Sequence, residues 1–464
     1  MSRTFTVLIK LLLLLFVIQG HAQNTKISGG FAHSLFLCEN GKVFSWGNNT
    51  YGQLGRDEST QEDINPDIVQ NLNNVVAIDA GKGNFSMALT NDSTLWTWGQ
   101  NNQWQLGTDA FCSPNNSCTS TAQPQHVLGG ETGDSILQHV IAFCAGLTQS
   151  YALLKSGEVV AWGDNYYGQL GNGNTTREKY PVYVRKSDGS HLQNIVYIAA
   201  GAFFGIAITA DGNVWGWGKN SENELGCGNK LNHSYAIPIL NDQQNLLSNI
   251  AQASCGFKHA LFLTKTGEVY GTGDYLGSNS FDSKIYYSTV SYAKKIDDLN
   301  AITNISCGFS HNIVMKKSGN ISTVLSWGDN KNISGTALSN GGQLGIGNDS
   351  IIHSFTPVYV LNSNGSQIEN VTSISASNGN CFIFTKNEIT GSKTLLGTGI
   401  NFSGQLGTRD HIDYYSATKI IMPRCYNHCQ SVFLGDNKTL CNPINDTLKI
   451  LIPSVNYIHT WYFN

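Results

Sequence analysis

Three histidines occupy the same position in repeated segments and are, by residue type, candidate metal ligands. His33, His259 and His311 each stand three residues after a glycine. A zinc site requires its ligands to converge on one ion, whereas equivalent positions of successive repeats are spread along an array. We therefore predict that each histidine completes the hydrogen bonds of a turn beside an inner strand. We predict no metal site.

A second candidate cluster lies near the C-terminus, where Cys425, His428 and Cys429 occur close together. A zinc finger would need a second pair of ligands at a similar spacing, and none follows. With Cys441 nearby, a disulfide is the favoured interpretation, and it suits an exported protein.

The other cysteines fall into two groups. Cys112 and Cys118 enclose a short polar segment, so we predict a local disulfide between them. Cys144, Cys255 and Cys307 instead recur just before the glycine of their repeats, a placement that favours small buried core residues. The chain has 11 cysteines, and an odd number leaves at least one thiol without an intramolecular partner.

No motif of a familiar catalytic or phosphate-binding site occurs. The sequence lacks the strings Gly-x-x-x-x-Gly-Lys-Ser/Thr, His-Glu-x-x-His and Gly-x-Ser-x-Gly. Asp164, Asp274 and Asp329 follow a recurring glycine, where a carboxylate most simply caps a turn. We predict no enzymatic activity and no cofactor, with an unrecognised hydrolase as the open alternative.

These residues belong to a segment that recurs along the chain. Residues 162–171 have the sequence WGDNYYGQLG and residues 46–55 the sequence WGNNTYGQLG, and related copies begin at 98, 217, 272, 327 and 398. Seven copies at a period near 55 residues indicate a repeat architecture. The fifth copy has lost the tryptophan and the Gln-Leu-Gly string, and the seventh has Thr398 in place of tryptophan. The tryptophans and leucines that the copies retain at these positions are Trp46, Leu54, Trp98, Leu106, Trp162, Leu170, Trp217, Leu225, Trp327, Leu344 and Leu406.

Each repeat contains four short apolar segments separated by turns. In residues 254–273 a glycine turn precedes an alternating strand, and a tight turn at Gly267 leads to the next strand. Segments such as 180–184 and 194–200 supply two further strands. We therefore predict an all-β fold, a seven-bladed β-propeller over residues 23–423. In such a ring the tryptophans and leucines pack between blades, and no sheet edge stays exposed.

The Trp-Gly-x-Asn-x-x-Gly-Gln-Leu-Gly element and the preceding Gly-x-x-His strand resemble the repeats of the regulator-of-chromosome-condensation family. The resemblance covers about residues 24–423 and implies a seven-bladed propeller. By analogy with the founding member, it also implies nucleotide exchange on a small GTPase as one alternative function. A secreted bacterial β-lactamase inhibitor has a similar propeller, so inhibition of an extracellular enzyme is another alternative.

Composition and the N-terminus indicate an exported protein. The net charge is −4 and only 13% of residues are charged, which gives no basic footprint for nucleic acid. Arg3 and Lys10 accompany an apolar run at 11–18, and residues 20–22 offer a small-residue cleavage site. We predict a signal peptide over residues 1–22, no membrane span after its cleavage, and a monomeric propeller that is secreted or at the cell surface.

Residues 424–464 depart from the repeat. The string at 434–441 and Thr-Trp-Tyr at 460–462 resemble the opening of immunoglobulin-like modules in surface proteins of Bacteroidetes-type bacteria. Such a module needs about seven strands and roughly 100 residues. We therefore expect an incomplete β-sandwich here and a chain that ends inside a domain.

Three insertions interrupt the period, at residues 112–118, 278–295 and 331–341. Loops on a rigid scaffold commonly carry recognition, and tyrosine supplies contact area at low entropic cost. Tolerated surface variation is the alternative interpretation of each loop. We predict an extracellular, non-enzymatic scaffold that presents rim loops to a protein or glycan partner, with Tyr286, Tyr287, Tyr292 and Asn332 as candidate contacts.

Overall fold

The computed structural model of the 464-residue chain describes residues 26–56, 60–109, 119–129, 133–274, 290–330, 341–423, 425, 432–433, 439–440, 447–450 and 459–462. The regular structure of these residues is entirely β-strand. None of these segments is therefore an apolar helix of membrane-spanning length. The chain divides into two units, Met1–Pro423 and Arg424–Asn464, and each is described by itself.

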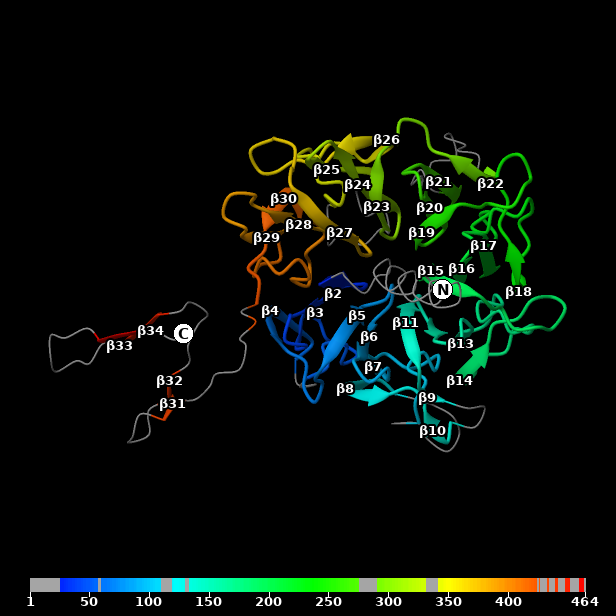
Figure 1. Cartoon of the computed structure of the whole chain (residues 1–464), viewed down its shortest axis with the longest axis horizontal. Helices are drawn as coiled ribbons and strands as arrows, with labels where there is room; N and C mark the ends of the chain where they lie inside the picture. The colour runs from blue at the N-terminus through cyan, green and yellow to red at the C-terminus, as the bar shows by residue number, and fades with distance from the viewer. Residues whose placement is uncertain are drawn as a thin grey trace, which may run out of the picture. The chain divides into compact units, whose positions relative to one another are not determined.

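Seven four-stranded antiparallel sheets follow one another along the first unit and surround a common centre (Figure 1). Each sheet, or blade, uses four strands that are consecutive in sequence, which confirms the prediction of an all-β seven-bladed propeller. Blades 1 to 4 contain β1 (Ile27–Gly29), β2 (His33–Leu37), β3 (Val43–Asn48) and β4 (Glu62–Ile68); β5 (Val75–Asp79), β6 (Phe85–Thr90), β7 (Leu95–Gly99) and β8 (Thr121–His126); β11 (Val140–Ala145), β12 (Gln149–Leu154), β13 (Val159–Gly163) and β14 (Glu178–Tyr183); and β15 (Ile195–Ala200), β16 (Phe204–Thr209), β17 (Val214–Gly218) and β18 (His233–Pro238). Blades 5 to 7 contain β19 (Ile250–Cys255), β20 (His259–Thr264), β21 (Val269–Gly273) and β22 (Val290–Lys295); β23 (Ile302–Cys307), β24 (His311–Ser318), β25 (Ile321–Asp329) and β26 (His353–Tyr359); and β27 (Val371–Ala376), β28 (Asn380–Lys386), β29 (Lys393–Gly399) and β30 (Tyr414–Lys419).

The first strand of every blade lies innermost, and β1 contacts both β5 and β27, so the first and last blades are neighbours (Figure 1). Because adjacent strands are antiparallel, the loop from strand 1 to strand 2 and the loop from strand 3 to strand 4 lie on the same face of the ring. We call this the mouth face. The turns between strands 2 and 3 form the opposite, hairpin face.

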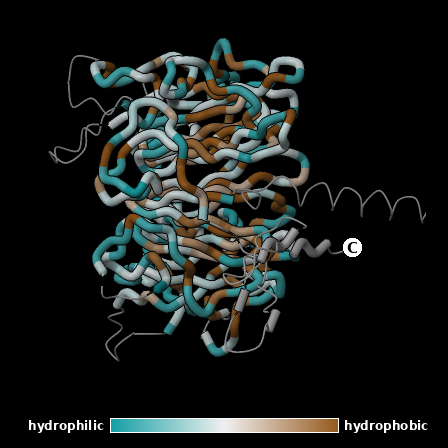
Figure 2. Tube along the Cα trace, turned by 90° about the vertical axis from the view of Figure 1, so that its left-hand side faces the viewer, coloured by the Kyte–Doolittle hydropathy of each residue, from teal (hydrophilic) through white to brown (hydrophobic). Residues whose placement is uncertain are grey.

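The hydrophobic core lies between blades. One cluster joins Tyr151 and Leu170 of blade 3 to Ile198 and Trp217 of blade 4, and comparable clusters join other neighbouring pairs. The second strand of a blade is therefore covered on both faces. In β20, the second strand of blade 5, every residue is buried. In Figure 2 the hydrophobic segments follow the strands, while hydrophilic residues occupy many of the loops.

Side chains of one blade satisfy backbone groups on the inner strand of the next. Asp79 Oδ2 accepts a hydrogen bond from the Ala145 N–H at 2.9 Å, and Ser254 Oγ accepts one from the Cys307 N–H at 2.9 Å. An inner strand has a ladder partner on one side only, and these bonds pair N–H groups that its free edge would leave open.

The remaining strands form small sheets outside the blades. β9 (Leu128–Gly129) pairs with β10 (Ser135–Ile136). In the second unit, β31 (Val432–Phe433) pairs with β32 (Thr439–Leu440), and β33 (Thr447–Ile450) pairs with β34 (His459–Tyr462). These two hairpins are the regular structure in the described part of that unit, and the immunoglobulin-like module stays a prediction.

Candidate functional site

The recurring Trp-Gly to Gln-Leu-Gly segment forms the loop between strands 3 and 4, and its own polar side chains hold it. In blade 3, Asn165 Oδ1 accepts from the Leu170 N–H at 2.9 Å, and Gln169 Oε1 accepts from the Tyr167 N–H at 2.8 Å. The asparagine-to-leucine bond recurs in blades 1, 2, 4, 6 and 7. Only glycine suits position 163, because φ is 102° and a Cβ would lie 2.5 Å from a backbone oxygen. The side-chain oxygens of Asn165 and Gln169 are thus used by backbone groups of the loop itself.

The tryptophan of the repeat joins its blade to the preceding one. Trp98, Trp162 and Trp217 donate from Nε1 to a backbone carbonyl at 2.9, 3.0 and 2.9 Å. Trp46 of blade 1 makes the same bond to Gln405 of blade 7 at 2.9 Å, so the ring closes with the contact used between other blades. These rings are fully buried. The other three acceptors are the glutamine carbonyls of the preceding blade, Gln53, Gln105 and Gln169.

Two repeats without tryptophan keep a hydrogen bond between blades through a hydroxyl. Thr272 Oγ1 donates at 2.7 Å to the Glu224 carbonyl, the position that accepts from tryptophan in other blades. Thr398 Oγ1 donates at 2.7 Å to the Gly342 carbonyl, one residue before the glutamine of the repeat. The polar contact between blades is therefore retained where the large ring is lost.

The recurring histidines also bridge blades. Nε2 of His33 lies 2.9 Å from Ser86 Oγ, Nε2 of His259 lies 2.9 Å from Asn312 Oδ1, and Nε2 of His311 lies 3.3 Å from Cys381 Sγ. Each ring thus reaches the next blade. Nδ1 of His33 and of His311 has no hydrogen-bond partner, so the prediction that these rings complete the hydrogen bonds of their own turns was wrong for these two. Burial lowers the pKa of His33 and His311 to about 3 and that of His259 to about 4. Within the described residues, no group of three or more His, Cys, Asp or Glu side chains is arranged to hold a metal.

The cysteines of the inner strands are core residues, as predicted. Cys144, Cys255 and Cys307 are buried free thiols, and burial raises the pKa of Cys307 to about 12, which makes it a poor nucleophile. Cys38 and Cys425 take part in disulfide bonds. The predicted pair Cys112 and Cys118 lies outside the described residues, as do Cys429 and Cys441.

On the mouth face, backbone hydrogen bonds link successive 1–2 loops. In blades 1 to 6 the residue after the loop glycine donates its N–H to the next blade's loop at 2.9 to 3.2 Å. Lys82 of blade 2 additionally extends its ammonium to the Cys307 carbonyl of blade 6 at 3.5 Å, across the centre of the ring. The loops are therefore fixed relative to one another. We call these donors the mouth ring: Phe31, Lys82, Leu147, Ala202, Phe257 and Phe309.

Five aromatic side chains form a continuous band across blades 3 to 6 of the mouth face. The ring centroids of Tyr166 and Tyr167 lie 4.9 Å apart, and those of Tyr167 and Phe203 lie 5.4 Å apart. Phe203 and Phe257 are separated by 5.9 Å, and Phe257 and Phe309 stack at 4.1 Å. Tyr166 is 75% exposed and the other four are half-buried. We call this set the aromatic band.

A single ammonium lies over three rings of the aromatic band. Lys219 Nζ is 5.5 Å from the centroid of Tyr167 and 5.8 Å from those of Phe203 and Phe257. A cation over aromatic faces is attracted by their electron density and is held in place. The arrangement offers an apolar surface with a positive charge held over it.

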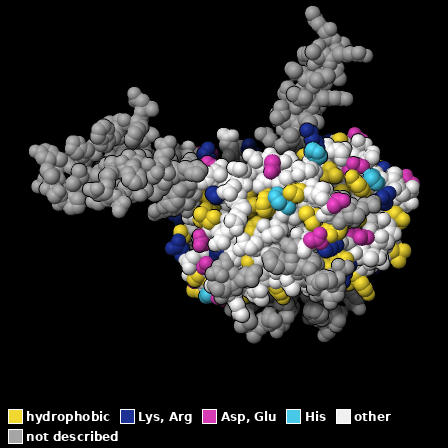
Figure 3. Space-filling model, turned by 90° about the horizontal axis from the view of Figure 1, so that it is seen from below, with side chains coloured by type: hydrophobic (Ala, Val, Ile, Leu, Met, Phe, Trp, Pro, Cys, Tyr) yellow, Lys and Arg dark blue, Asp and Glu magenta, His cyan; other side chains and the backbone are white. Residues whose placement is uncertain are grey.

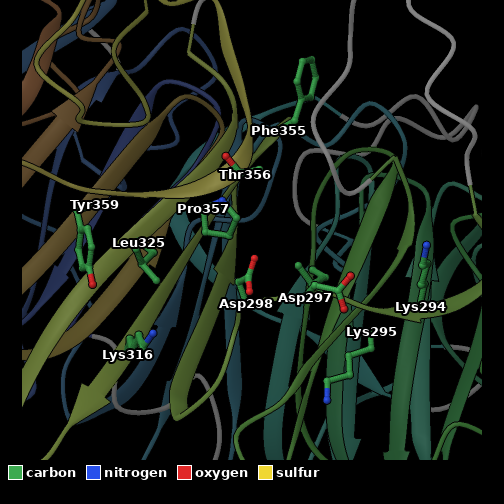
Figure 4. A pocket seen from close by; sticks show the side chains of 11 residues that line it. Lys294, Lys295, Asp297, Asp298, Lys316, Leu325, Phe355, Thr356, Pro357 and Tyr359 are labelled. Atoms are coloured by element: carbon green, nitrogen blue, oxygen red, sulfur yellow. The ribbon is translucent and has the colours of Figure 1, made fainter.

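A groove lies on the outer side between blades 5 and 6. It encloses about 400 Å³ and is lined by residues of both blades, among them Lys294, Asp298, Lys316, Phe355 and Tyr359. Its lysines and aspartates are spread along the groove and do not converge on one point (Figure 4). On the side of the propeller shown in Figure 3, acidic and basic side chains are likewise interspersed.

Most of the loops predicted to contact a partner lie outside the described residues, including Tyr286, Tyr287 and Asn332. Tyr292 is described and lies half-buried on β22. Its hydroxyl oxygen is 2.6 Å from the position of a Cβ on Gly228, and Tyr235 contacts Gly173 in the same way. Tyr292 therefore packs against the 3–4 loop of the preceding blade.

The repeat pattern alone did not reveal the aromatic band. Its phenylalanines follow the loop glycine of three successive repeats, Gly201, Gly256 and Gly308. An alignment of the repeats would have shown aromatic residues in these 1–2 loops, but it would not have shown that the rings touch.

A protein-family model described as the RCC1-like domain matches residues 13–383 of the chain. The human E3 ubiquitin-protein ligase HERC2 is 30% identical over 295 residues, which are 62% of this chain and 6% of that protein. The chain spans between 6% and 52% of the length of such curated relatives, so it corresponds to one part of them.

Solved structures show the same fold at low identity. Human WBSCR16 superimposes with a TM-score of 0.62 and 20% identity, covering 78% of this chain and 87% of that one. Prp20p from Saccharomyces cerevisiae, whose structure was described with its binding to Gsp1p and histones, gives 0.60 and 19%, covering 84% and 88%.

Proposed function

Because this chain belongs to the RCC1-like domain family, we propose that it is a binding scaffold that holds a protein partner on its mouth face. The propeller would act by presenting rigid loops, and no catalytic step is assigned to it. The aromatic band is the observation that carries the proposal.

The band has the composition of a binding site rather than of a core. Aromatic side chains dominate the energetic centres of protein interfaces, and here they are gathered on one part of one face. The hairpin face offers a contrast, since its exposed apolar residues include the isolated Ile321 and Ile389.

The mouth ring favours tight recognition because it reduces the entropic cost of binding. Inter-blade bonds at 2.9 to 3.2 Å already fix the loops that carry Phe257 and Phe309. A surface ordered before binding loses less conformational freedom in the complex.

Binding can be tested with a pair of matched variants, Phe257→Ser/Phe309→Ser on the mouth face and Ile321→Ser/Ile389→Ser on the hairpin face. The tagged chain and both variants are expressed in the cells that produce it, cross-linked and analysed by mass spectrometry. We expect one protein to be recovered in stoichiometric amount with the wild-type chain and the hairpin variant and to be lost with the mouth variant. If the partner protein were lost only with the hairpin variant, recognition would lie on the hairpin face and the proposal would be wrong.

We also propose that the protein acts outside the cytoplasm. The N-terminal segment has the charge and apolar pattern of a leader, and disulfide-bonded cysteines are typical of oxidising compartments. N-terminal sequencing of the mature protein should give a start near Gln23 in the secreted or surface fraction. A full-length chain in the cytosol bound to a small GTPase would favour the exchange-factor alternative.

A further inference from the structure

Blade 4 departs from its neighbours at two positions of the 3–4 loop. In blade 1 the side chain of Gln53 donates to Asn48 Oδ1 at 2.8 Å, and in blade 3 that of Gln169 donates to Asp164 Oδ2 at 2.9 Å. Blade 4 has Lys219 and Glu224 at the corresponding positions. The polarity of the pair is reversed, because the first position now carries the donor and the second carries only acceptors.

Lys219 and Glu224 do not pair with each other. No ion pair formed by the described residues includes Lys219. Glu224 Oε2 accepts from the Glu222 N–H at 2.8 Å, while the buried Oε1 has no hydrogen-bond partner. The lysine lies instead over the rings of Tyr167, Phe203 and Phe257. The presence of Lys219 and Glu224 in place of the pairs of blades 1 and 3 therefore puts a cation on the mouth face.

The acidic side chains in the 3–4 loops of blades 3 and 4 form no ion pair with this cation among the described residues. Asp164 Oδ2 accepts hydrogen bonds from Gln169 Nε2 at 2.9 Å and Thr148 Oγ1 at 3.3 Å. Glu224 is buried; burial raises its pKa, while the charge of Lys219 acts in the opposite direction from beyond ion-pair distance. Glu222 is half-buried and forms no ion pair among the described residues. The surface seen by a partner is consequently aromatic with an available positive charge, on a chain whose net charge is −4.

We propose that the mouth face recognises an acidic, apolar segment of a protein, with Lys219 binding its carboxylate and the aromatic band packing against its hydrophobic side chains. This inference rests on the proposed function and names the chemistry of the partner. The three rings beneath the ammonium hold it in position, so less side-chain entropy is lost when the ion pair forms. Because Lys219 is half-buried among these rings, an ion pair formed there is less screened than one in bulk solvent.

The ring geometry favours a protein over a glycan. A sugar stacks on an open aromatic face, but Phe257 and Phe309 cover each other at 4.1 Å. Lys219 lies above Tyr167 and Phe203. Apart from the exposed Tyr166, the rings of the band are partly covered and lie beside a cation, which suits aliphatic or aromatic side chains next to a carboxylate.

The inference can be tested with the full chain and labelled random copolymers of glutamate and tyrosine, using copolymers of lysine and tyrosine and polygalacturonate for comparison. Binding is followed by fluorescence anisotropy. We expect the wild-type chain to bind the acidic copolymer and not the basic one. Lys219→Met keeps the apolar stem and removes the charge, and we expect about a tenfold weaker affinity.

Two matched variants separate the site from its surroundings. Lys219→Asn/Glu224→Gln restores the amide pair of blade 1 and should lose affinity like Lys219→Met while keeping the native unfolding midpoint. Lys258→Met removes a lysine of the adjacent 1–2 loop that is not stacked on the rings, and we expect less than a twofold change. Equal losses for Lys258→Met and Lys219→Met would indicate general attraction and overturn the assignment to Lys219.

The outcomes distinguish this inference from the proposed function. If Phe257→Ser/Phe309→Ser weakens binding and Lys219→Met does not, the mouth face binds but the carboxylate assignment is wrong. If neither change matters, the aromatic band is not the binding site and both proposals fail. Binding of polygalacturonate with the same dependence on Lys219 would assign the face to acidic glycans and overturn the protein assignment.

Discussion

The joints on the two sides of blade 4 satisfy equivalent carbonyls in different ways. Towards blade 3, Trp217 donates to Gln169 at 2.9 Å. Towards blade 5, Thr272 donates to Glu224 at 2.7 Å. Both joints keep a buried hydrogen bond, but only the first adds an indole ring, and a buried tryptophan contributes far more apolar contact than a threonine methyl.

The comparison shows which part of the repeat is required and which is adjustable. An unpaired buried carbonyl is costly, so a donor is present in both joints. The apolar area can vary, because neighbouring blades also pack through the rest of their strands. Blade 4 carries the weaker joint and also the reversed pair Lys219 and Glu224, so the same loop that departs from the repeat supplies the cation of the mouth face.

Trp217→Ala tests the stronger joint and should have the largest effect. We expect it to lower the free energy of unfolding by about 3–5 kcal/mol, because it leaves a large cavity and an unpaired carbonyl. Urea unfolding followed by fluorescence or circular dichroism measures the change. Trp215→Ala, on the same strand but half-buried, is the control and should cost clearly less; equal costs would contradict the role of the joint.

The histidine bridges between blades should make the ring sensitive to acid. The pKa of His33 is lowered to about 3 in the folded protein, whereas an unfolded histidine has a pKa of about 6.5. The contribution of neutral His33 to the free energy of unfolding is therefore complete above pH 6.5. It is lost as the pH falls towards 3, by about 1.4 kcal/mol per pH unit.

His33→Gln removes this titration, and a glutamine already occupies the equivalent position 149 in blade 3. We expect the difference in free energy of unfolding between pH 7 and pH 5 to shrink by about 2 kcal/mol in the variant. The measurement is urea unfolding at each pH. An unchanged difference would show that His33 is not held neutral by burial.

Thr272→Val tests the weaker joint and should have a smaller effect than Trp217→Ala. The shape is kept, but the Glu224 carbonyl loses its donor, and we expect a cost of about 1–2 kcal/mol. Thr175→Val, at an exposed threonine, serves as control in the same unfolding assay. A cost as large as that of Trp217→Ala would remove the distinction between the two joints.

Lys219→Met should have the smallest effect on stability. Its cation–π contacts are half-exposed, and we expect a change within about 0.5 kcal/mol in the urea assay. A large loss of stability would mean that Lys219 belongs to the joint between blades rather than to the mouth face.

The sequence by itself determined the architecture. The period near 55 residues, the recurring Trp-Gly and Gln-Leu-Gly strings and the alternating apolar segments are local patterns, and a blade that cannot bury both faces alone must stack on its neighbours. These patterns predicted the number of blades, four strands in each blade and the buried cysteines of the inner strands.

Only the tertiary structure decided which repeats act together. That Trp46 bonds to Gln405, that His33 reaches Ser86, and that the aromatic band joins Tyr167 to Phe309 depend on contacts between residues from different repeats. A side chain at one position of a repeat has several neighbours within reach across the blade interface, and its own sequence does not select among them. The ring geometry selects them, because closing seven twisted sheets fixes the distance and rotation between every blade and the next.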